Sequence, residues 1–177
     1  MSNKDFDALI KKLHELNQEV GKEVTMRAVK QAGRIVQAQA KLLINSDSGA
    51  LARSVRVKNE VKEDAASSTV YTNSEYAAYY EFGTGPNGQA DHEGISPEVT
   101  PRYSQTGWTI PADAMSPTKA EEYGFGIAMK DGVVVGYYTN GQMARPFMYP
   151  ALHDNVDNIK KNTRRLLLKK LKEISKK

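Results

Sequence analysis

Three histidines and the acids beside them are the residues of this chain that could carry catalysis or bind a metal ion. Asp91-His92-Glu93 is the group most like a set of metal ligands, but it falls in a stretch rich in glycine and proline, and no second group has ligand spacing. Metal sites need ligands from rigid elements, so we predict no metal ion there. His153-Asp154 lies at the start of a predicted helix, where the helix dipole alone favours an acid. His14 lies in a charged part of a helix and is expected at the surface.

The other residue patterns that catalysis or nucleotide binding would need are missing from the sequence. There is no cysteine and no Gly-x-Ser-x-Gly nucleophile elbow. The run from Gly83 to Gly88 is rich in glycine but lacks the Gly-Lys-Ser/Thr ending of a phosphate loop, so we interpret it as a turn. We predict a protein that is not an enzyme and has no catalytic residue and no cofactor. An enzyme using His92 or His153 stays an alternative without an evident substrate.

Length and composition predict one domain, residues 1–177, with a loop and hairpin insertion at about 86–143. The 177 residues suit a single domain of ordinary size. The polar start lacks the apolar core of a signal peptide, and no run of about 18 apolar residues could span a membrane. The net charge is +4, and much of it comes from the C-terminal end. The basic residues there are Lys160, Lys161, Arg164, Arg165, Lys169, Lys170, Lys172, Lys176 and Lys177.

This basic C-terminal end gives an alternative function, a nucleic-acid-binding module that uses the last helix. Such a helix could hold phosphates. However, lysine and arginine also commonly solvate the outer face of an amphipathic helix and cover apolar surface with their stems. Nothing in the chain resembles a sequence-reading module. We favour the solvated face and expect at most weak contact with DNA.

The first 44 residues predict one long amphipathic helix. Apolar and small residues recur three or four apart from Asp5 to Ile44, and no proline interrupts them. The row consists of Phe6, Leu9, Leu13, Leu16, Val20, Val24, Ala28, Ala32, Ile35, Gln39 and Leu42. Because the pattern is longer than a usual globular helix, it either kinks near Gly21 or projects from the body. A partner subunit is one way to cover a projecting stripe. The alternative is a helix that packs wholly on its own sheet.

The following residues predict a pair of strands and a short helix. Asn45 to Gly49 should end the long helix. Leu51 to Lys62 alternates as a half-buried strand, the residues 63–66 form a turn, and Ser68 to Thr72 forms an antiparallel partner. A helical turn through Tyr76 to Phe82 would be capped by Asn73 or Ser74 and ended by Gly83 in a left-handed conformation.

The second half of the chain predicts a loop at 86–105, a strand at 108–111 and a helical turn at 116–122 that Ser116 caps. Lys130-Asp131-Gly132 should join two strands into a hairpin. Pro150 opens a last helix to Ile174. Its apolar face is Val156, Ile159, Leu166, Leu167, Leu171 and Ile174. The fold class is therefore α+β: a small antiparallel sheet with the long N-terminal and C-terminal helices packed on one face, and a β-hairpin insertion.

Two segments, Tyr76 to Gly85 and Ala144 to Leu152, are too rich in large apolar groups for plain loops. We expect Glu81 and Arg145 to form a partly buried pair that fixes the start of the last helix. Core packing is the favoured interpretation of the aromatic residues. Because Tyr79, Tyr80 and Phe82 cannot all face one way, one of them is expected to meet a neighbouring protein. The candidate structural or interface residues are Tyr76, Tyr79, Tyr80, Glu81, Phe82, Gly83, Arg145, Pro146, Phe147 and Pro150.

Three motifs in order resemble the tail-completion family of long-tailed bacteriophages and prophages. They are Gly49-x-Leu51-x-x-Ser54-Val55, the run from Tyr76 to Gly85, and Ala144-Arg145-Pro146-Phe147-Met148-Tyr149-Pro150-Ala151-Leu152. The departures from the family pattern are Val55 for isoleucine, Tyr80 for valine and Met148 for leucine.

The resemblance implies a structural protein of the phage head–tail junction, for tail completion or head–tail joining. Such proteins form rings, usually sixfold, that finish the tail tube or join it to the neck. The implied partners are further copies of the chain, tail-tube proteins and neck or connector proteins, with possible weak contact with passing DNA. The implied location is the tail or neck of the virion, assembled in the host cytoplasm.

Overall fold

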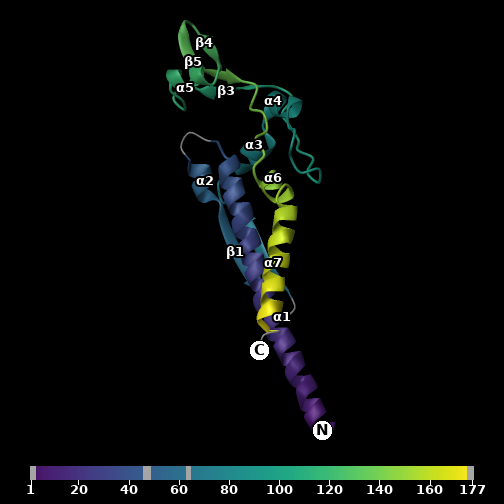
Figure 1. The fold of residues 1–177 in the computed structure, drawn as a ribbon. Helices are drawn as coiled ribbons and strands as arrows, with labels where there is room; N and C mark the ends of the chain where they lie inside the picture. Colours follow the sequence, from purple (N-terminus) through teal and green to yellow (C-terminus); the bar gives the residue numbers. More distant parts are fainter. Residues whose placement is uncertain (1–2, 46–48, 63–64, 175–177) are drawn as a thin grey trace. The chain divides into compact units, whose positions relative to one another are not determined.

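The computed structural model describes residues 3–45, 49–62 and 65–174, with side chains from Gly21 to Glu173 within those ranges. The chain divides into two compact units (Figure 1). The first unit is Met1–Asn73 together with Ala151–Lys177, and the second unit is Ser74–Pro150. The predicted insertion at 86–143 lies inside the second unit.

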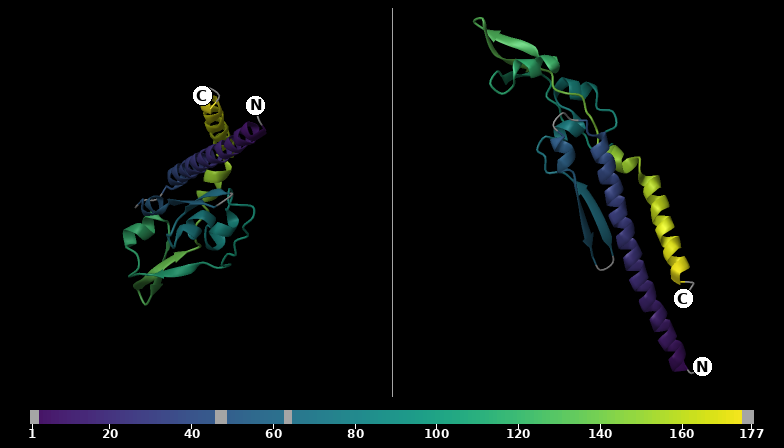
Figure 2. Two further views of the ribbon diagram at one scale, coloured as in Figure 1. Left: turned by 90° about the horizontal axis from the view of Figure 1, so that it is seen from below. Right: turned by 60° about the vertical axis from the view of Figure 1, so that its left-hand side comes forward.

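Helix α1 is the longest element of the first unit and runs without a break from Asn3 to Leu43, 41 residues. The predicted kink near Gly21 does not end the helix. The N-terminal end of α1 instead extends past the ends of the other elements of the first unit (Figures 1 and 2). The projecting alternative is therefore the one that the structure has. The side chains of the predicted apolar row before Gly21, and His14, lie outside the described residues.

Strands β1, Arg56–Val61, and β2, Ala66–Tyr71, form the predicted antiparallel pair and pack on α1. They approach α1 closely at Gly33, where a Cβ atom would meet the side chains of Ser68 and Val57. Glycine at this position lets the hairpin lie directly on the helix backbone. The buried apolar residues of the helix, the hairpin and the segment between them are Ala28, Val36, Ala40, Ile44, Leu51 and Val55.

The second half of the predicted apolar row on α1 is corrected by the structure. Leu42 is 76% exposed, and Ala32, Ile35 and Gln39 are only half-buried. The buried row is instead Ala28, Val36, Ala40 and Ile44, on the side of Gly33. The predicted row and the buried row share Ala28 and then diverge, because the hairpin packs on the side of the helix where Gly33 lies.

The predicted strand from Leu51 is wrong in its first part, because residues Ala50–Ser54 form a short helix, α2. Gly49 precedes it with φ of 62°, and the Ser54 hydroxyl donates to the Leu51 carbonyl at 2.7 Å. Leu51 and Val55 are both buried. Their spacing of four fits a helical turn as well as an alternating strand, which explains the error. The predicted turns at 46–48 and 63–64 lie outside the described residues.

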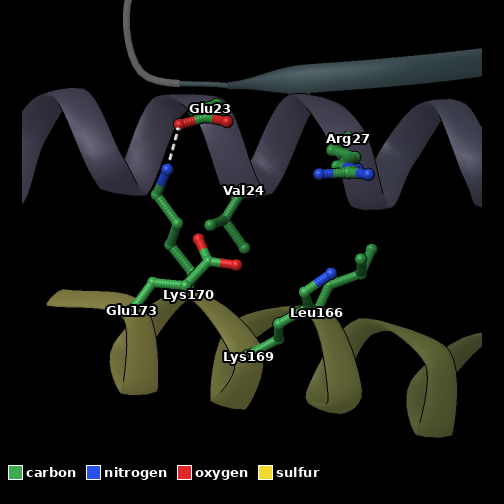
Figure 3. Close-up of a pocket in the computed structure, with 7 residues that line it drawn as sticks. All are labelled: Glu23, Val24, Arg27, Leu166, Lys169, Lys170 and Glu173. Atoms are coloured by element: carbon green, nitrogen blue, oxygen red, sulfur yellow. Dashed lines mark hydrogen bonds and ion pairs between the residues drawn. The ribbon is translucent and has the colours of Figure 1, made fainter. Parts of the chain in front are cut away.

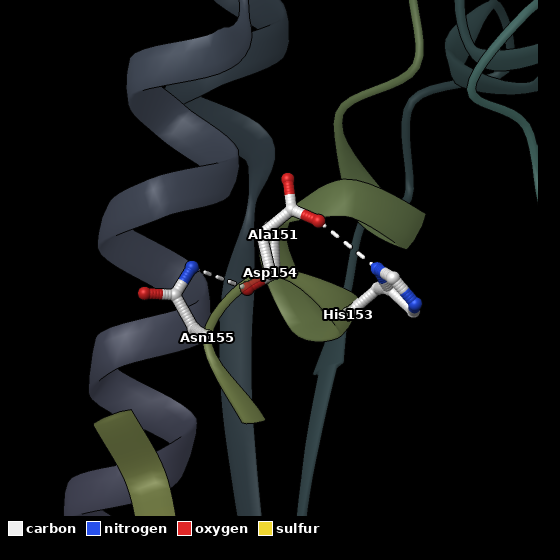
Figure 4. A network of polar contacts seen from close by, with 4 residues as sticks. All are labelled: Ala151, His153, Asp154 and Asn155. Carbon is white, nitrogen blue, oxygen red and sulfur yellow. Dashed lines mark hydrogen bonds and ion pairs between the residues drawn. The ribbon is translucent and has the colours of Figure 1, made fainter. Parts of the chain in front are cut away.

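The last helix is two helices, α6, Met148–His153, and α7, Val156–Ile174. At the break, the Asn155 side-chain amide donates to the Ala151 carbonyl at 3.0 Å, and His153 Nδ1 lies 3.0 Å from Asp154 Oδ1 (Figure 4). Asp and Asn are poor helix formers, and their side chains compete for backbone groups. Helix α7 makes its most extensive contacts with α1, not with a sheet as predicted.

The second unit contains three short helices, three strands and the start of a fourth helix. In chain order they are α3, Ala77–Phe82; α4, Gly85–Ala90; β3, Trp108–Pro111; α5, Pro117–Glu122; β4, Gly126–Lys130; β5, Val133–Thr139; and the first residues of α6. Helix α4 replaces the first part of the predicted loop at 86–105. Ser116 caps α5 as predicted, accepting from the Lys119 amide.

The sheet of the second unit has the order β3-β5-β4 and is antiparallel throughout. Asp131 and Gly132 both have positive φ, 52° and 79°, as the tightest hairpin turn requires, so the predicted hairpin is confirmed. The α+β class with long N-terminal and C-terminal helices is confirmed as well. The described strands form two small sheets, where the sequence predicted one. None of the helices in the described part of the chain is long and apolar enough to cross a membrane.

Candidate functional site

The two aromatic segments predicted as central meet within the second unit, at helix α3. Tyr80 and Glu81 point inward and are buried, whereas Tyr79 is 58% exposed and Tyr76, which precedes the helix, is 44% exposed. The Tyr80 ring packs edge-on against Phe147, which is almost completely buried, with ring centroids 5.9 Å apart. The predicted split of the aromatic residues into core and surface is therefore what the structure has.

The buried carboxylate of Glu81 accepts hydrogen bonds from the backbone amides at the start of helix α6. Its Oε2 accepts from the amides of Phe147 at 2.7 Å and Met148 at 2.9 Å, and its Oε1 accepts from the Tyr149 amide at 3.1 Å. The first amides of a helix have no partner inside the helix and carry partial positive charge, so a carboxylate there satisfies both needs. We call Glu81 with these three amides the Glu81 clamp.

The predicted ion pair between Glu81 and Arg145 is wrong. Among the described residues, Arg145 forms no ion pair with Glu81, and its side chain is exposed. The guanidinium lies 5.9 Å from the centroid of the Tyr80 ring, and the Arg145 amide donates to the Tyr80 carbonyl at 2.8 Å. A cation–π contact keeps the charge in water, whereas an ion pair would have required burying it. Glu81 does fix the start of a helix, but through the backbone.

Residues 140–144 run alongside the end of α3 and the segment that follows it. Backbone and side-chain hydrogen bonds join the two segments. The Thr84 amide donates to the Gln142 carbonyl at 2.8 Å, and the Gln142 side-chain amide donates to the Tyr79 carbonyl at 2.9 Å. Gly83 is one of the positions where the two segments approach each other closely. Its φ is 75°, and a Cβ atom would lie 2.8 Å from the Gln142 carbonyl oxygen. Gly83 ends α3 with positive φ as predicted, but its ψ of 179° is extended and not that of the left-handed helical conformation. The cap position of α3 is occupied by Tyr76, and not by Asn73 or Ser74 as predicted.

The remaining predicted residues lie around this contact. Phe82 is half-buried, and its carbonyl accepts from the Tyr103 hydroxyl at 2.8 Å. Pro146 is half-buried beside Gly94. Pro150 is the third residue of α6 and does not open it. Proline is tolerated there because amides of the first helical turn have no partner in the helix.

Two features of this unit escaped the sequence analysis. Tyr103 and Gln142 bind backbone carbonyls of α3 from segments distant in the chain, and no local pattern marks such contacts. Glu81 could have been assigned to a helix start, since a buried acid needs donors and every helix start offers them. Burial raises the pKa of the Tyr103 phenol. The phenol therefore keeps the proton that it donates to the Phe82 carbonyl.

The polar side chains of the second unit do not gather into a reactive centre. His92 lies beside Tyr103, with ring centroids 5.7 Å apart, and its Nδ1 is 3.1 Å from the Gly88 carbonyl oxygen. Within the part of the chain that the structure describes, no three histidine, aspartate or glutamate side chains are placed to hold a metal ion. The arrangement around α3 positions backbone and aromatic groups for packing.

Strands β4 and β5 expose apolar side chains, which in the sequence had indicated only a hairpin. We call Ile127, Met129, Val133, Val134 and Val135 the apolar hairpin. Ile127, Met129 and Val133 are each more than 60% exposed, and Val134 and Val135 are exposed to lesser extents. Val135 is the extra residue of a bulge, since Ala128 pairs with Gly136 and Met129 pairs with Val134. Strands β3 and β4 are each paired on one side only in the described sheet.

Residues 7–83 match the family model HK97-gp10-like, described as Bacteriophage HK97-gp10, putative tail-component. The resemblance seen in the sequence motifs is thereby confirmed over this segment. The matched family is one of structural phage tail components and not of enzymes. No curated protein and no solved structure matches the chain.

The matched segment contains helix α1 from residue 7, the first motif and the second motif as far as Gly83. The motif from Ala144 to Leu152 lies beyond it. This third motif is nevertheless joined to the matched segment by the Glu81 clamp.

Proposed function

We propose that this tail component forms a ring at the head–tail junction, where it completes the tail or joins it to the neck. Six copies would form the ring in the virion. Further copies of the chain, tail-tube proteins and neck or connector proteins would be its partners. The ring would be assembled in the host cytoplasm.

The apolar hairpin is the observation that carries this proposal. Large apolar side chains that are exposed together mark interaction surfaces in soluble proteins. The strands β4 and β5 and their turn contain only two charged residues, Lys130 and Asp131. An apolar surface with few charges suits a stable protein–protein contact. Contact with a different surface of the next copy would close a ring by rotation.

The aromatic segments take two roles in this proposal. The buried residues Tyr80, Glu81, Gly83 and Phe147 hold the segments together, with Phe82, Pro146 and Pro150 around them. The exposed Tyr76, Tyr79 and Arg145 are available to a neighbouring protein. Tyrosine and arginine are among the residues that contribute most to protein interfaces.

Light scattering of the purified chain over a range of concentrations, with negative-stain images of any large species, tests the ring. A discrete closed species whose images give the symmetry is the expected result. The variant Ile127→Glu/Met129→Glu should remove it, because it places charge on the apolar hairpin. The control Thr100→Glu/Thr118→Glu adds the same charge at exposed positions elsewhere in the second unit and should assemble as the parent does.

If the parent is a monomer at every concentration, the same variants are compared for co-assembly with tail-tube protein. A parent that joins neither itself nor the tube would overturn the proposal. So would equal assembly of the two double variants.

A further inference from the structure

The basic residues of this chain are concentrated in two helical segments of the first unit. Residues 24–44, in and just after α1, and 158–172, in α7, contain 11 of the chain's 25 lysines and arginines and none of its 21 acids. The rest of the chain therefore has 14 basic and 21 acidic residues, and its net charge is negative. Charge separation on this scale is an electrostatic property of the whole molecule, and it suggests a partner for the positive part.

Six of these cations form two rows. Arg27, Lys30 and Arg34 are three and four residues apart, so they share one side of α1. The second row, Lys161, Arg165 and Lys169, shares one side of α7 by the same spacing. All six side chains are exposed.

The two rows border the same groove. Helices α1 and α7 lie side by side and antiparallel (Figures 1 and 2). Arg27 ends one row and Lys169 ends the other, and both line the pocket between the helices together with Val24 and Leu166 (Figure 3). Since the rows meet at this pocket and follow adjacent antiparallel helices, they run along its two walls. We call these six residues the basic groove.

Two acids lie at one end of the basic groove, and one of them, Glu23, also interacts electrostatically with Arg27. Glu23 is paired with Lys170 at 2.7 Å, and this neighbour lowers the pKa of Glu23. Glu173 lines the same pocket. Among the described residues, none of the six groove cations forms an ion pair. Like charges this close repel one another, so the arrangement favours an anionic partner.

We propose that the basic groove binds the phosphate backbone of double-stranded nucleic acid without reading its sequence. Each row spans about 10–12 Å at the helical rise of about 1.5 Å per residue. Over that length a duplex carries about six or seven phosphate charges. Exposed arginines and lysines along a groove give affinity through counterion release, and nothing in the groove is suited to base edges.

The test is fluorescence anisotropy of a duplex of about 30 base pairs, titrated with the full chain at several salt concentrations. If six phosphates are contacted, affinity should fall about 10³-fold between about 50 and 200 mM salt. The groove variant Arg27→Gln/Arg34→Gln/Arg165→Gln should bind more weakly at low salt and lose only about 40-fold over the same range, because about three contacts remain.

The matched control is Arg102→Gln/Lys119→Gln/Lys130→Gln, which removes three exposed cations of the second unit. Both triple variants lower the formal net charge from +4 to +1, so a difference between them reports position and not charge. The control should keep the salt dependence of the parent. Circular dichroism melts establish that both variants are folded.

Equal binding by the two triple variants, or a parent without steep salt dependence, overturns the proposal. Competition identifies other anions: if polyglutamate displaces the duplex at equal charge, an acidic protein is the better partner. Binding to anionic lipid vesicles but not to the duplex overturns the proposal in favour of a lipid surface. The assay does not require assembly, so a monomer that binds DNA through the groove would support this inference even where the ring fails.

Discussion

The first and second units differ both in what they bury and in what they expose. The first buries small side chains of α1 beneath a hairpin and exposes the basic groove. The second is tied together by a buried acid and exposes the apolar hairpin. The difference teaches that a single chain can carry two surfaces whose partners are opposite in chemistry. Substitutions in the two units should therefore destabilise the protein for different physical reasons.

The largest expected effect is on the Glu81 clamp. Glu81→Gln keeps one acceptor oxygen but replaces the other with an amide donor that faces backbone N–H groups. Leaving buried donors unpaired should lower the free energy of unfolding by about 2–4 kcal/mol. Urea titration monitored by fluorescence measures it. An unchanged midpoint would mean that the clamp does not hold the second unit together.

The corresponding site in the first unit is Gly33, with Gly21 on the same helix as its control. Alanine at Gly21 meets no atom within 4 Å and should stabilise the helix by about 1 kcal/mol. Alanine at Gly33 meets Ser68 and Val57. The overpacking should cost about 1–3 kcal/mol, from which the same gain in helix propensity is subtracted. Thermal melts of the two variants should therefore move in opposite directions. Ser68→Ala should relieve part of the Gly33→Ala effect, because it removes the hydroxyl that the new methyl group meets.

A smaller effect is expected at Arg145, and it separates the observed contact from the ion pair expected from the sequence. Its guanidinium is exposed over Tyr80, and such cation–π contacts contribute about 0.5–1 kcal/mol. Arg145→Gln should lower the free energy of unfolding by no more than this. A loss as large as that of Glu81→Gln, in the same urea titration, would mean that the two side chains act as a pair.

The smallest effect is a pH dependence at Tyr103. Because burial raises the pKa of its phenol above the ordinary value of 10.0, the folded state holds the proton more tightly than the unfolded state. The resulting stability is present below pH 10 and is lost as pH rises through the pKa of the folded protein. The difference in unfolding free energy between the parent and Tyr103→Phe should shrink between pH 8 and pH 10.5. Since Phe has no ionisable hydroxyl, a constant difference would contradict the assignment.

Sequence patterns predicted those features whose signals are local. Asp131-Gly132 predicted the hairpin, and Ser116-Pro117 predicted a capped helix; both are present. The errors arose where distant segments decide the structure. Leu51 fits a strand or a helical turn, and only the packing selects the turn.

The candidate site shows the same limit. Glu81 was correctly singled out, but its partner was taken to be the nearest opposite charge. Individual backbone amides carry no mark in a sequence, so only the predicted helix start nearby could have indicated them in place of the arginine. Only half of the basic groove could be predicted from the sequence. The charges of α7 form a run, whereas those of α1 are spread over several turns of a helix.

The Glu81 clamp also closes a long loop of the chain. Glu81 and the three residues whose amides it binds are separated by 66 to 68 positions in the sequence. Everything between α3 and α6 is a loop whose two ends are held at one point. The entropy of closing such a loop rises only with the logarithm of its length, by about 0.6 kcal/mol for each doubling. The hairpin can therefore lengthen, shorten or change its apolar tip while the clamp is unaffected. A protein built in this way can acquire a new neighbour by altering its loop alone.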